Sequence, residues 1–362
     1  MCIRDSYHTI YNGFNNRIDF DLINGGPSNY NFIGSGNSNT IFNNTVAAAT
    51  DYNYIGNGAF NVLDDTSFNF IGTGQNNHIH KGSTSLIGSG QNNRIIGGKC
   101  SAIIGGFNNY ITSDYSAIGT GTSNSLRGDY GFIGAGDSNT IVGGADFNSV
   151  GGGRRNIINQ GTDFSFIGGG CNNAIGNGVS FANIGGGQNN QVSGNYSGIF
   201  SGFQNNVTGA YSAVMSGCQN EVTSNLSGTA SGTYNVVQSD YGFIGGGDRN
   251  NIQTGSDYGF IGGGAANVLH APQGFIGGGR NNRIESSQSA ILGGFNNFID
   301  VNSDHSVILG GSNNVIPPFM PYSSVFGQGV NAVAPHTFHV ESMHATALPL
   351  PLSLIHISEP TR

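Results

Sequence analysis

IGGGRNNRI, at residues 276–284, is one copy of a short pattern that fills this 362-residue chain. Other clear copies are IGSGQNNRI (87–95) and IGGGQNNQV (184–192), and about twenty copies follow one another, once every 14–17 residues over most of the chain. Self-similarity at a fixed short period is typical of a solenoid, in which each copy buries its apolar side against its neighbours. We therefore predict an all-β parallel β-solenoid of about 20 Gly/Asn-rich repeats over residues 7–335.

Each copy is expected to form two short strands joined by tight turns. The first strand contains the first apolar residue of the copy, here called the anchor, and the second contains the apolar residue eight positions later. Ile87 with Ile95, and Ile276 with Ile284, are such pairs. Side chains alternate between the faces of a strand, so these two columns form a thin core. The glycines after the anchor permit the positive φ that a tight turn requires.

An asparagine is assigned to the sixth position after the anchor in every copy. Asparagine side chains in stacked turns can bond to the turns above and below, so we predict a structural asparagine ladder. The alternative is a ligand-binding column. The ladder is expected to contain Asn77, Asn93, Asn109, Asn173, Asn190, Asn282 and Asn297, and the same spacing is taken to include Asn206 and Asn331.

Aromatic residues occupy the third position before the anchor in most copies, and often the position just before the anchor. Both columns have a parity that directs them away from the aliphatic core. A stripe of exposed rings along a rod indicates a contact surface between two or three rods. Packing at the corner of each coil and a strip that binds glycan or receptor are the alternatives. The candidate residues are Tyr115, Tyr130, Phe164, Tyr211, Tyr241 and Tyr258.

Composition and motifs argue against several function classes. Charged residues make up 9% of the chain and the net charge is -8, whereas nucleic-acid binding needs clustered Lys and Arg. The string G-x-G recurs as turn chemistry rather than once between a strand and a helix, so no nucleotide site is expected. Asp137 and Asp248 are too isolated for a calcium-binding β-roll. We expect no enzyme, no cofactor, no nucleic-acid partner and no small-molecule substrate.

Histidines gather near the C-terminus of the sequence. His336, His339, Glu341 and His344 are residue types that bind zinc. In an extended segment, however, His336 and His339 point to opposite faces. We therefore predict no metal site there, but a strand that begins a further module over residues 336–351.

The cysteines, the longer spacings between copies and the two ends of the sequence give the remaining predictions. We expect free thiols at Cys100, Cys171 and Cys218, and loops in the two longer intervals between the first three copies. Residues 1–6 and 352–362 resemble translated sequencing-adapter sequence, so both segments are expected to be artefacts and are excluded from the fold prediction.

The stretches SAIIGGFNNYITSDYSAIGTG (101–121) and SFIGGGCNNAIGNGVSFANIGGGQNNQVSGNYS (165–197) resemble the head repeats of trimeric autotransporter adhesins. The resemblance covers about residues 10–333. It implies a YadA-like left-handed parallel β-roll, a homotrimer at the bacterial outer membrane, and attachment to a host surface protein or glycan.

Similar repeats occur in phage and large-virus fibre proteins. The segment SSVFGQGVNAVAPHTFHVESMHA (323–345) looks like the exit from such a repeat into a fibre module. That resemblance implies a virion tail fibre that also binds a host surface. A third hypothesis is a purely structural spacer, with no ligand of its own.

Overall fold

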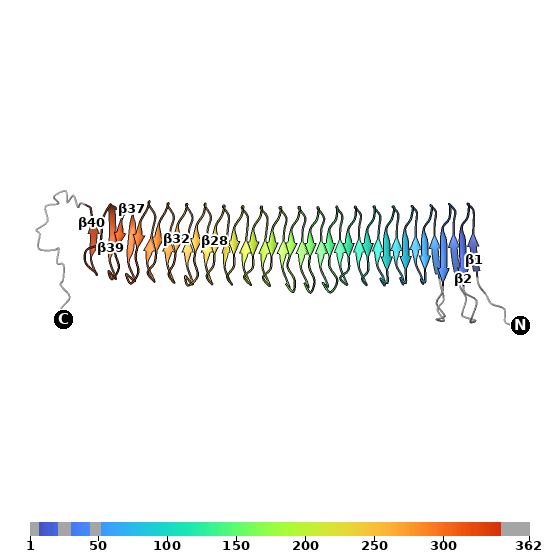
Figure 1. Ribbon diagram of the computed structural model, residues 1–362, viewed down its shortest axis with the longest axis horizontal. Coiled ribbons are helices and arrows are strands. Elements are labelled where there is room, and N and C mark those ends of the chain that lie inside the picture. The colour runs from blue at the N-terminus through green and yellow to red at the C-terminus, as the bar shows by residue number, and fades with distance from the viewer. Residues whose placement is uncertain (1–6, 21–29, 44–51, 342–362) are drawn as a thin grey trace, which may run out of the picture.

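Two columns of short strands build the whole fold, which is a parallel β-solenoid of about 18 turns. The computed structural model describes residues 7–20, 30–43 and 52–341. These residues form a straight rod in which the strands lie side by side across the long axis (Figure 1). The predicted fold class is confirmed. Both suspected adapter segments and the two loops expected among the first three copies lie outside the described residues.

Sheet A contains the strands that carry the anchors, and each pairs in parallel with the anchor strand of the next turn. Its strands are β1 (Tyr7–Ile10), β3 (Tyr30–Ile33), β5 (Tyr52–Ile55), β7 (Phe70–Ile71), β9 (Leu86–Ile87), β11 (Ala102–Ile103), β13 (Ala117–Ile118), β15 (Phe132–Ile133), β17 (Ser149–Val150), β19 (Phe166–Ile167), β21 (Asn183–Ile184), β23 (Gly198–Ile199), β25 (Ala213–Val214), β27 (Gly228–Thr229), β29 (Phe243–Ile244), β31 (Phe260–Ile261), β33 (Phe275–Ile276), β35 (Ala290–Ile291), β37 (Val307–Ser312), β39 (Ser324–Gln328) and β40 (Phe338–Val340).

Sheet B contains the second strand of each turn, paired in the same way. Its strands are β2 (Arg17–Phe20), β4 (Thr40–Asn43), β6 (Val62–Asp64), β8 (His78–His80), β10 (Arg94–Ile96), β12 (Tyr110–Ile111), β14 (Ser125–Leu126), β16 (Thr140–Ile141), β18 (Ile157–Ile158), β20 (Ala174–Ile175), β22 (Gln191–Val192), β24 (Asn206–Val207), β26 (Glu221–Val222), β28 (Val236–Val237), β30 (Asn251–Ile252), β32 (Val268–Leu269), β34 (Arg283–Ile284), β36 (Phe298–Ile299) and β38 (Val315–Ile316).

The core lies between the two sheets. In most turns it receives one aliphatic side chain from sheet A and one from sheet B. Anchor stacks on anchor, as Ile103 on Ile118 in sheet A, and Ile111 stacks on Leu126 in sheet B. All four side chains are fully buried. The register is constant from turn to turn until the β37–β39 pairing, where it shifts between Ile308 and Gly310, so identical positions of the repeat form continuous columns along most of the rod. This stacking explains why the sequence period is retained over most of the described solenoid.

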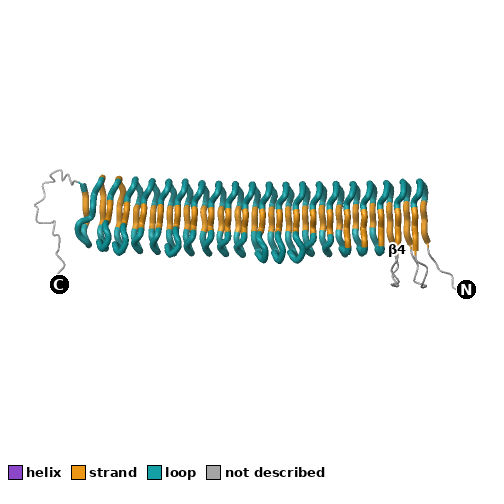
Figure 2. The backbone as a smooth tube through the Cα atoms, viewed as in Figure 1, coloured by secondary structure: helices purple, strands orange, loops and turns teal. Residues whose placement is uncertain are grey.

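Most strands are only two residues long, and tight turns join them at two corners of each coil (Figure 2). At the first corner Gly106 has a φ of +102°, and an added Cβ would lie 2.2 Å from the carbonyl oxygen of Gly121 in the next turn. Only glycine fits this position, because a side chain would be strained and would also collide with the neighbouring backbone. The predicted role of the turn glycines follows from this geometry.

A second column of buried polar residues, not predicted from the sequence, lies two positions before the anchor. Ser116 is representative and nearly fully buried. Its single hydroxyl proton is shared between the carbonyl oxygens of Asp114 and Gly128, which lie 2.9 and 3.0 Å from Oγ, and Oγ accepts a hydrogen bond from the main-chain N–H of Gly131. The inner face of sheet A is therefore partly polar, and its hydroxyls connect neighbouring turns at the second corner.

The C-terminal turns depart from the regular repeat. Strand β40 pairs in parallel with β39, so sheet A continues to Val340. Within the described residues the structure has no helix, and hence none that is long and apolar enough to cross a membrane.

Candidate functional site

The asparagine column lies at the first corner, inside the coil. Asn109 shows the arrangement: its main-chain N–H and its Nδ2 both donate to Oδ1 of Asn93 in the preceding turn. Its Nδ2 also donates to the carbonyl oxygens of Gly105 in the same turn and Gly121 in the next. The side chains are buried, so they hold turns together and are not accessible to a ligand. The structure places in this column Asn77, Asn93, Asn109, Asn173, Asn190, Asn282 and Asn297.

Two further asparagines were placed in the ladder wrongly. Asn205, not Asn206, donates its main-chain N–H to Oδ1 of Asn190, because Asn205 lies six residues after its anchor. At the C-terminal end the last turn is one residue out of step: the main-chain N–H of Val330 bonds to Oδ1 of Asn314, and Asn331 is exposed. The ladder therefore ends at Asn314.

The aromatic rings of the column three residues before the anchor stack on one another at the second corner. Tyr115 and Tyr130 are parallel to within 5°, with ring centroids 5.0 Å apart, and Tyr130 and Phe147 lie 4.6 Å apart. We call this column the aromatic edge. Its longest continuous stack is Tyr115, Tyr130, Phe147, Phe164, Phe181, Tyr196 and Tyr211, and shorter stacks are formed by Tyr7, Tyr30, Tyr52 and Phe68, by Tyr241 and Tyr258, and by Tyr322 with His305 and His336.

The turn backbone fixes the position of each ring on the aromatic edge. Tyr130 adopts a left-handed conformation with φ 54°, and its main-chain N–H donates to the carbonyl oxygen of Asp114 in the preceding turn. Tyr115 has the same conformation, with φ 54°. Left-handed backbone is costly for a bulky residue, so its repetition at this corner depends on the inter-turn hydrogen bonds around it.

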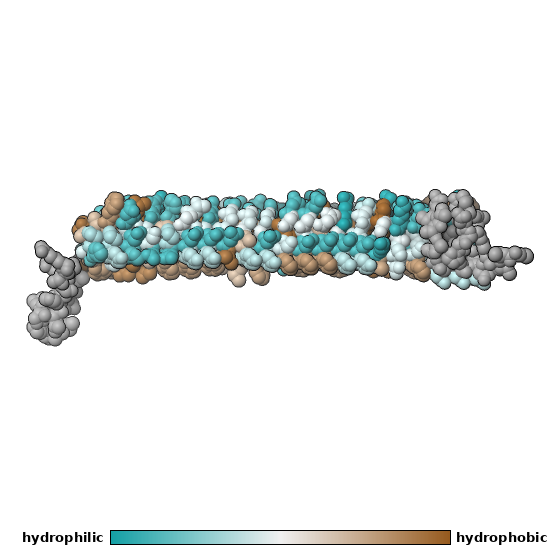
Figure 3. Space-filling model, turned by 90° about the horizontal axis from the view of Figure 1, so that it is seen from below, coloured by the Kyte–Doolittle hydropathy of each residue, from teal (hydrophilic) through white to brown (hydrophobic). Residues whose placement is uncertain are grey.

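About half of each ring remains accessible to solvent. The six residues predicted for the contact strip are exposed by 47–59%, and they are Tyr115, Tyr130, Phe164, Tyr211, Tyr241 and Tyr258. The rings therefore pack against one another at the corner but not into the core. The second aromatic column also has members on the outer surface of sheet A, where Phe243 stacks on Phe260 and Phe260 on Phe275. Figure 3 shows a band of hydrophobic residues along one margin of the rod, beside rows of hydrophilic ones.

Carboxylates accompany part of the aromatic edge, because the residue before the ring is aspartate in four consecutive turns, at Asp114, Asp129, Asp146 and Asp163. The main-chain N–H of Asp114 donates to Oδ1 of Asp129, that of Asp129 to Asp146, and that of Asp146 to Asp163. This acidic column was not singled out from the sequence, although Asp before Tyr or Phe recurs there. Over these four turns the aromatic edge combines ring faces with a line of negative charge.

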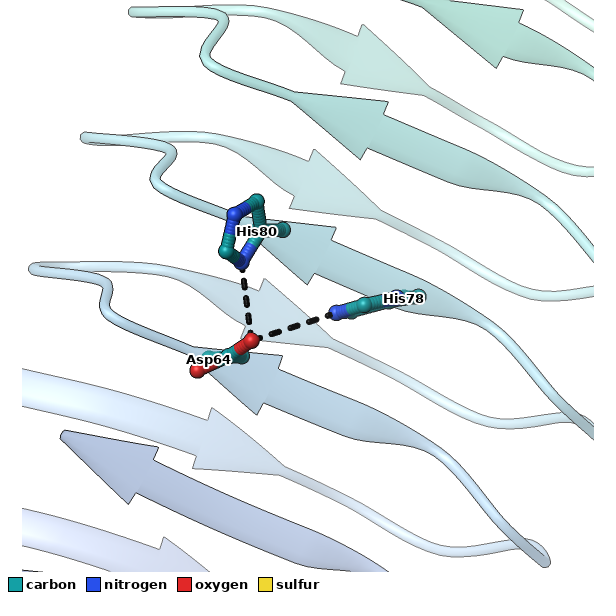
Figure 4. A group of neighbouring side chains, drawn as sticks. All are labelled: Asp64, His78 and His80. Carbon is teal, nitrogen blue, oxygen red and sulfur yellow. Dashed lines mark hydrogen bonds and ion pairs between the residues drawn. The ribbon is translucent and has the colours of Figure 1, made fainter. Parts of the chain in front are cut away.

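Three possible metal ligands meet on the outer face of sheet B, near the N-terminal end of the described solenoid (Figure 4). Oδ2 of Asp64, on β6, lies 2.8 Å from Nδ1 of His80 and 4.0 Å from Nε2 of His78, both on β8. All three side chains are partly exposed. No metal site was expected from the sequence, and this group was missed because Asp64 lies one repeat before the two histidines. The motif His78-Ile79-His80 was the available indication.

Burial and charge favour the neutral form of His78. Partial burial lowers the pKa of its imidazole, the guanidinium of Arg94 lowers it further, and the Asp64 carboxylate opposes both effects. The neutral ring keeps one nitrogen lone pair free for a ligand role.

The C-terminal histidines do not meet. The ring of His336 stacks on Tyr322, and Nε2 of His339 lies 3.2 Å from the carbonyl oxygen of Ala334. Oε2 of Glu341 accepts a hydrogen bond from the main-chain N–H of Gln328. His344 lies outside the described residues. Cys100, Cys171 and Cys218 are free thiols.

Comparison with known proteins leaves the family open. No known protein family matches the chain, and no curated protein aligns with it significantly. The resemblance to autotransporter heads and fibre proteins therefore remains a prediction, and function has to be argued from the surface of the rod.

Proposed function

We propose that this chain is a non-enzymatic adhesin head, an elongated homotrimeric rod of left-handed β-roll type that attaches a cell to a host surface. Its place is the cell surface at the outer membrane, and its partner is a host surface protein or glycan. The three chains meet along their aromatic edges. The proposal rests on the repeat resemblance together with one structural observation, the continuous half-exposed stack of rings.

The aromatic edge supports self-association for a physical reason. Seven rings stack without a break from Tyr115 to Tyr211, and their outer halves face solvent in the single chain. A contiguous apolar surface of this kind marks an interaction site. Because the strip runs along the rod axis, a partner that follows it over the same length must itself be a rod with the same repeat. A second and a third copy meet this requirement.

Trimerisation also supplies a mechanism for attachment. Every turn of a solenoid presents the same outer positions again, and a trimer presents them three times. Many weak contacts with one surface raise the effective concentration of each remaining contact, so the assembly binds more tightly than one site. This mechanism needs no catalytic residue and no deep pocket.

The test replaces four rings of the aromatic edge with alanine, at Tyr115, Tyr130, Tyr241 and Tyr258. Fluorescent rods are applied to cultured host cells with and without prior glycosidase treatment, and their mass is followed by light scattering. We expect the fourfold variant to lose the trimer and, with it, most of the cell binding. Loss of binding by an intact trimer would instead assign the rings to a ligand strip.

A matched control uses rings at the opposite corner of the coil. Phe107, Phe203 and Phe295 are also partly exposed, by 38–45%, but lie beside the glycine turn. Their replacement by alanine should leave both mass and binding unchanged. If wild-type rods bind no host cell, the adhesin proposal is refuted and the structural-spacer hypothesis remains. Binding to bacterial cells alone would favour the phage-fibre hypothesis.

A further inference from the structure

We propose that Asp64, His78 and His80 form a binding site for a divalent transition-metal ion of the Zn²⁺ type on the outer face of sheet B. The site does not depend on the proposed function. It arises because two neighbouring turns of sheet B bring Asp64 directly beside His80 and diagonally beside His78.

The pairing of β6 with β8 brings the three side chains to one surface. Asp64 is the direct partner of His80, and Val62 is the partner of His78. His78 and His80 are two residues apart on one strand, so they share a face, with the buried Ile79 pointing inward between them. Directly paired and diagonal neighbours of adjacent strands are within reach of long side chains. Figure 4 shows both imidazoles directed toward the carboxylate.

The distances suit a shared ion. One ligand atom from each of the three residues lies within 4.8 Å of the other two. Zinc binds histidine nitrogen and carboxylate oxygen at roughly 2.0–2.2 Å, so its ligand atoms lie about 3–4 Å apart. The Asp64–His80 distance of 2.8 Å is shorter than this spacing, and the Asp64–His78 distance of 4.0 Å is at its upper end. Small rotations of the partly exposed side chains would bring both distances to the spacing around a zinc ion without movement of the backbone.

An orphaned atom points to a missing ligand. Within the described residues, Nε2 of His78 is buried from solvent and has no hydrogen-bond partner. It faces Oδ2 of Asp64 at 4.0 Å, which is too long for a hydrogen bond. A buried polar atom without a partner is costly, and an ion between the two groups would satisfy it.

The donor set selects the kind of metal. Two imidazole nitrogens and one carboxylate oxygen suit Zn²⁺ and similar transition ions, whereas Ca²⁺ and Mg²⁺ prefer oxygen ligands alone. Three protein ligands leave one position for water, as in open zinc sites. Arg94, on β10 of the next turn, is the direct strand partner of His78. Its positive charge repels a cation bound at the site. Its exposed side chain weakens the site but does not block it.

The experiment titrates the tag-free full chain, with all four cysteines changed to serine, with Co²⁺ and then Zn²⁺. Cobalt absorbance reports nitrogen and oxygen ligation, and calorimetry with Zn²⁺ gives the affinity and stoichiometry. We expect one ion per chain. Replacements His78→Ala, His80→Ala and Asp64→Asn should each weaken binding by at least about tenfold. Arg94→Ala should tighten it, because a like charge is removed.

The control variant is His270→Ala, an exposed histidine on the far part of the rod that should have no effect. Circular dichroism of every variant establishes that the solenoid is intact. Zn²⁺, but not Mg²⁺, should raise the melting temperature of the wild-type chain, because an ion that binds only the folded state stabilises it. The site is refuted by absence of one-to-one binding, or by affinity that is the same in the folded His78 and His80 variants.

Discussion

At the scale of single residues, the molecule depends on side chains that bond from turn to turn. Asn109 donates through Nδ2 to Asn93, Gly105 and Gly121, and its neighbour Asn108 lies on the surface. Replacement of asparagine by aspartate is therefore expected to affect stability differently at these two adjacent positions. The difference between the two variants measures the contribution of the asparagine ladder.

Asn109→Asp should destabilise the rod by at least about 2 kcal/mol, because a buried carboxylate has no N–H to donate and faces carbonyl oxygens. Asn108→Asp introduces the same charge at an exposed left-handed position that aspartate tolerates, and should change stability by less than about 0.5 kcal/mol. Urea unfolding monitored by circular dichroism measures both. Equal effects would show that the ladder contributes nothing beyond the surface charge.

Residues whose role follows from position within the repeat were predictable from sequence. The core columns, the asparagine column and the aromatic column all recur at fixed spacing, so one-dimensional periodicity identified them. The meeting of Asp64 with His78 and His80 was not predicted, since it needs the register of two adjacent turns and occurs once. The serine and aspartate columns were missed because their composition varies from turn to turn.

At the scale of the element, each turn is a pair of two-residue strands held by its corners. Such strands are too short to be stable alone, so the turns decide whether a coil forms. Gly169 and Gly170 illustrate the difference between neighbouring turn positions. An added Cβ meets nothing within 4 Å at Gly169, whereas at Gly170 it would lie 2.1 Å from the carbonyl oxygen of Gly187, with φ at +88°.

Gly170→Ala should therefore open the coil locally and lower the unfolding free energy by more than about 2 kcal/mol, whereas Gly169→Ala should be nearly neutral. Limited proteolysis would locate the opened turn. Thermal unfolding would give the loss of unfolding free energy that the substitution causes. A Gly170→Ala rod as stable and as resistant to protease as Gly169→Ala would mean that the turn backbone relaxes without penalty.

At the scale of the whole molecule, the rod is a one-dimensional stack in which each turn contacts its two neighbours. Stability in such a stack is close to a sum of nearest-neighbour terms, so the core grows with the number of turns. About 18 turns at roughly 4.8 Å per turn give a length of about 86 Å. Periodicity alone predicted this architecture, but it does not determine how many rods associate, because that depends on surfaces that a single chain leaves exposed.

The most direct test of the account is the mass and length of the intact rod in solution. Light scattering after size exclusion, combined with small-angle X-ray scattering, gives both quantities on one sample. The account predicts a particle of three times the 37.5 kDa chain mass and a length of about 86 Å over the solenoid, with the three aromatic edges joined. A particle with the mass of one chain would contradict it, because the aromatic edge would then be a free surface.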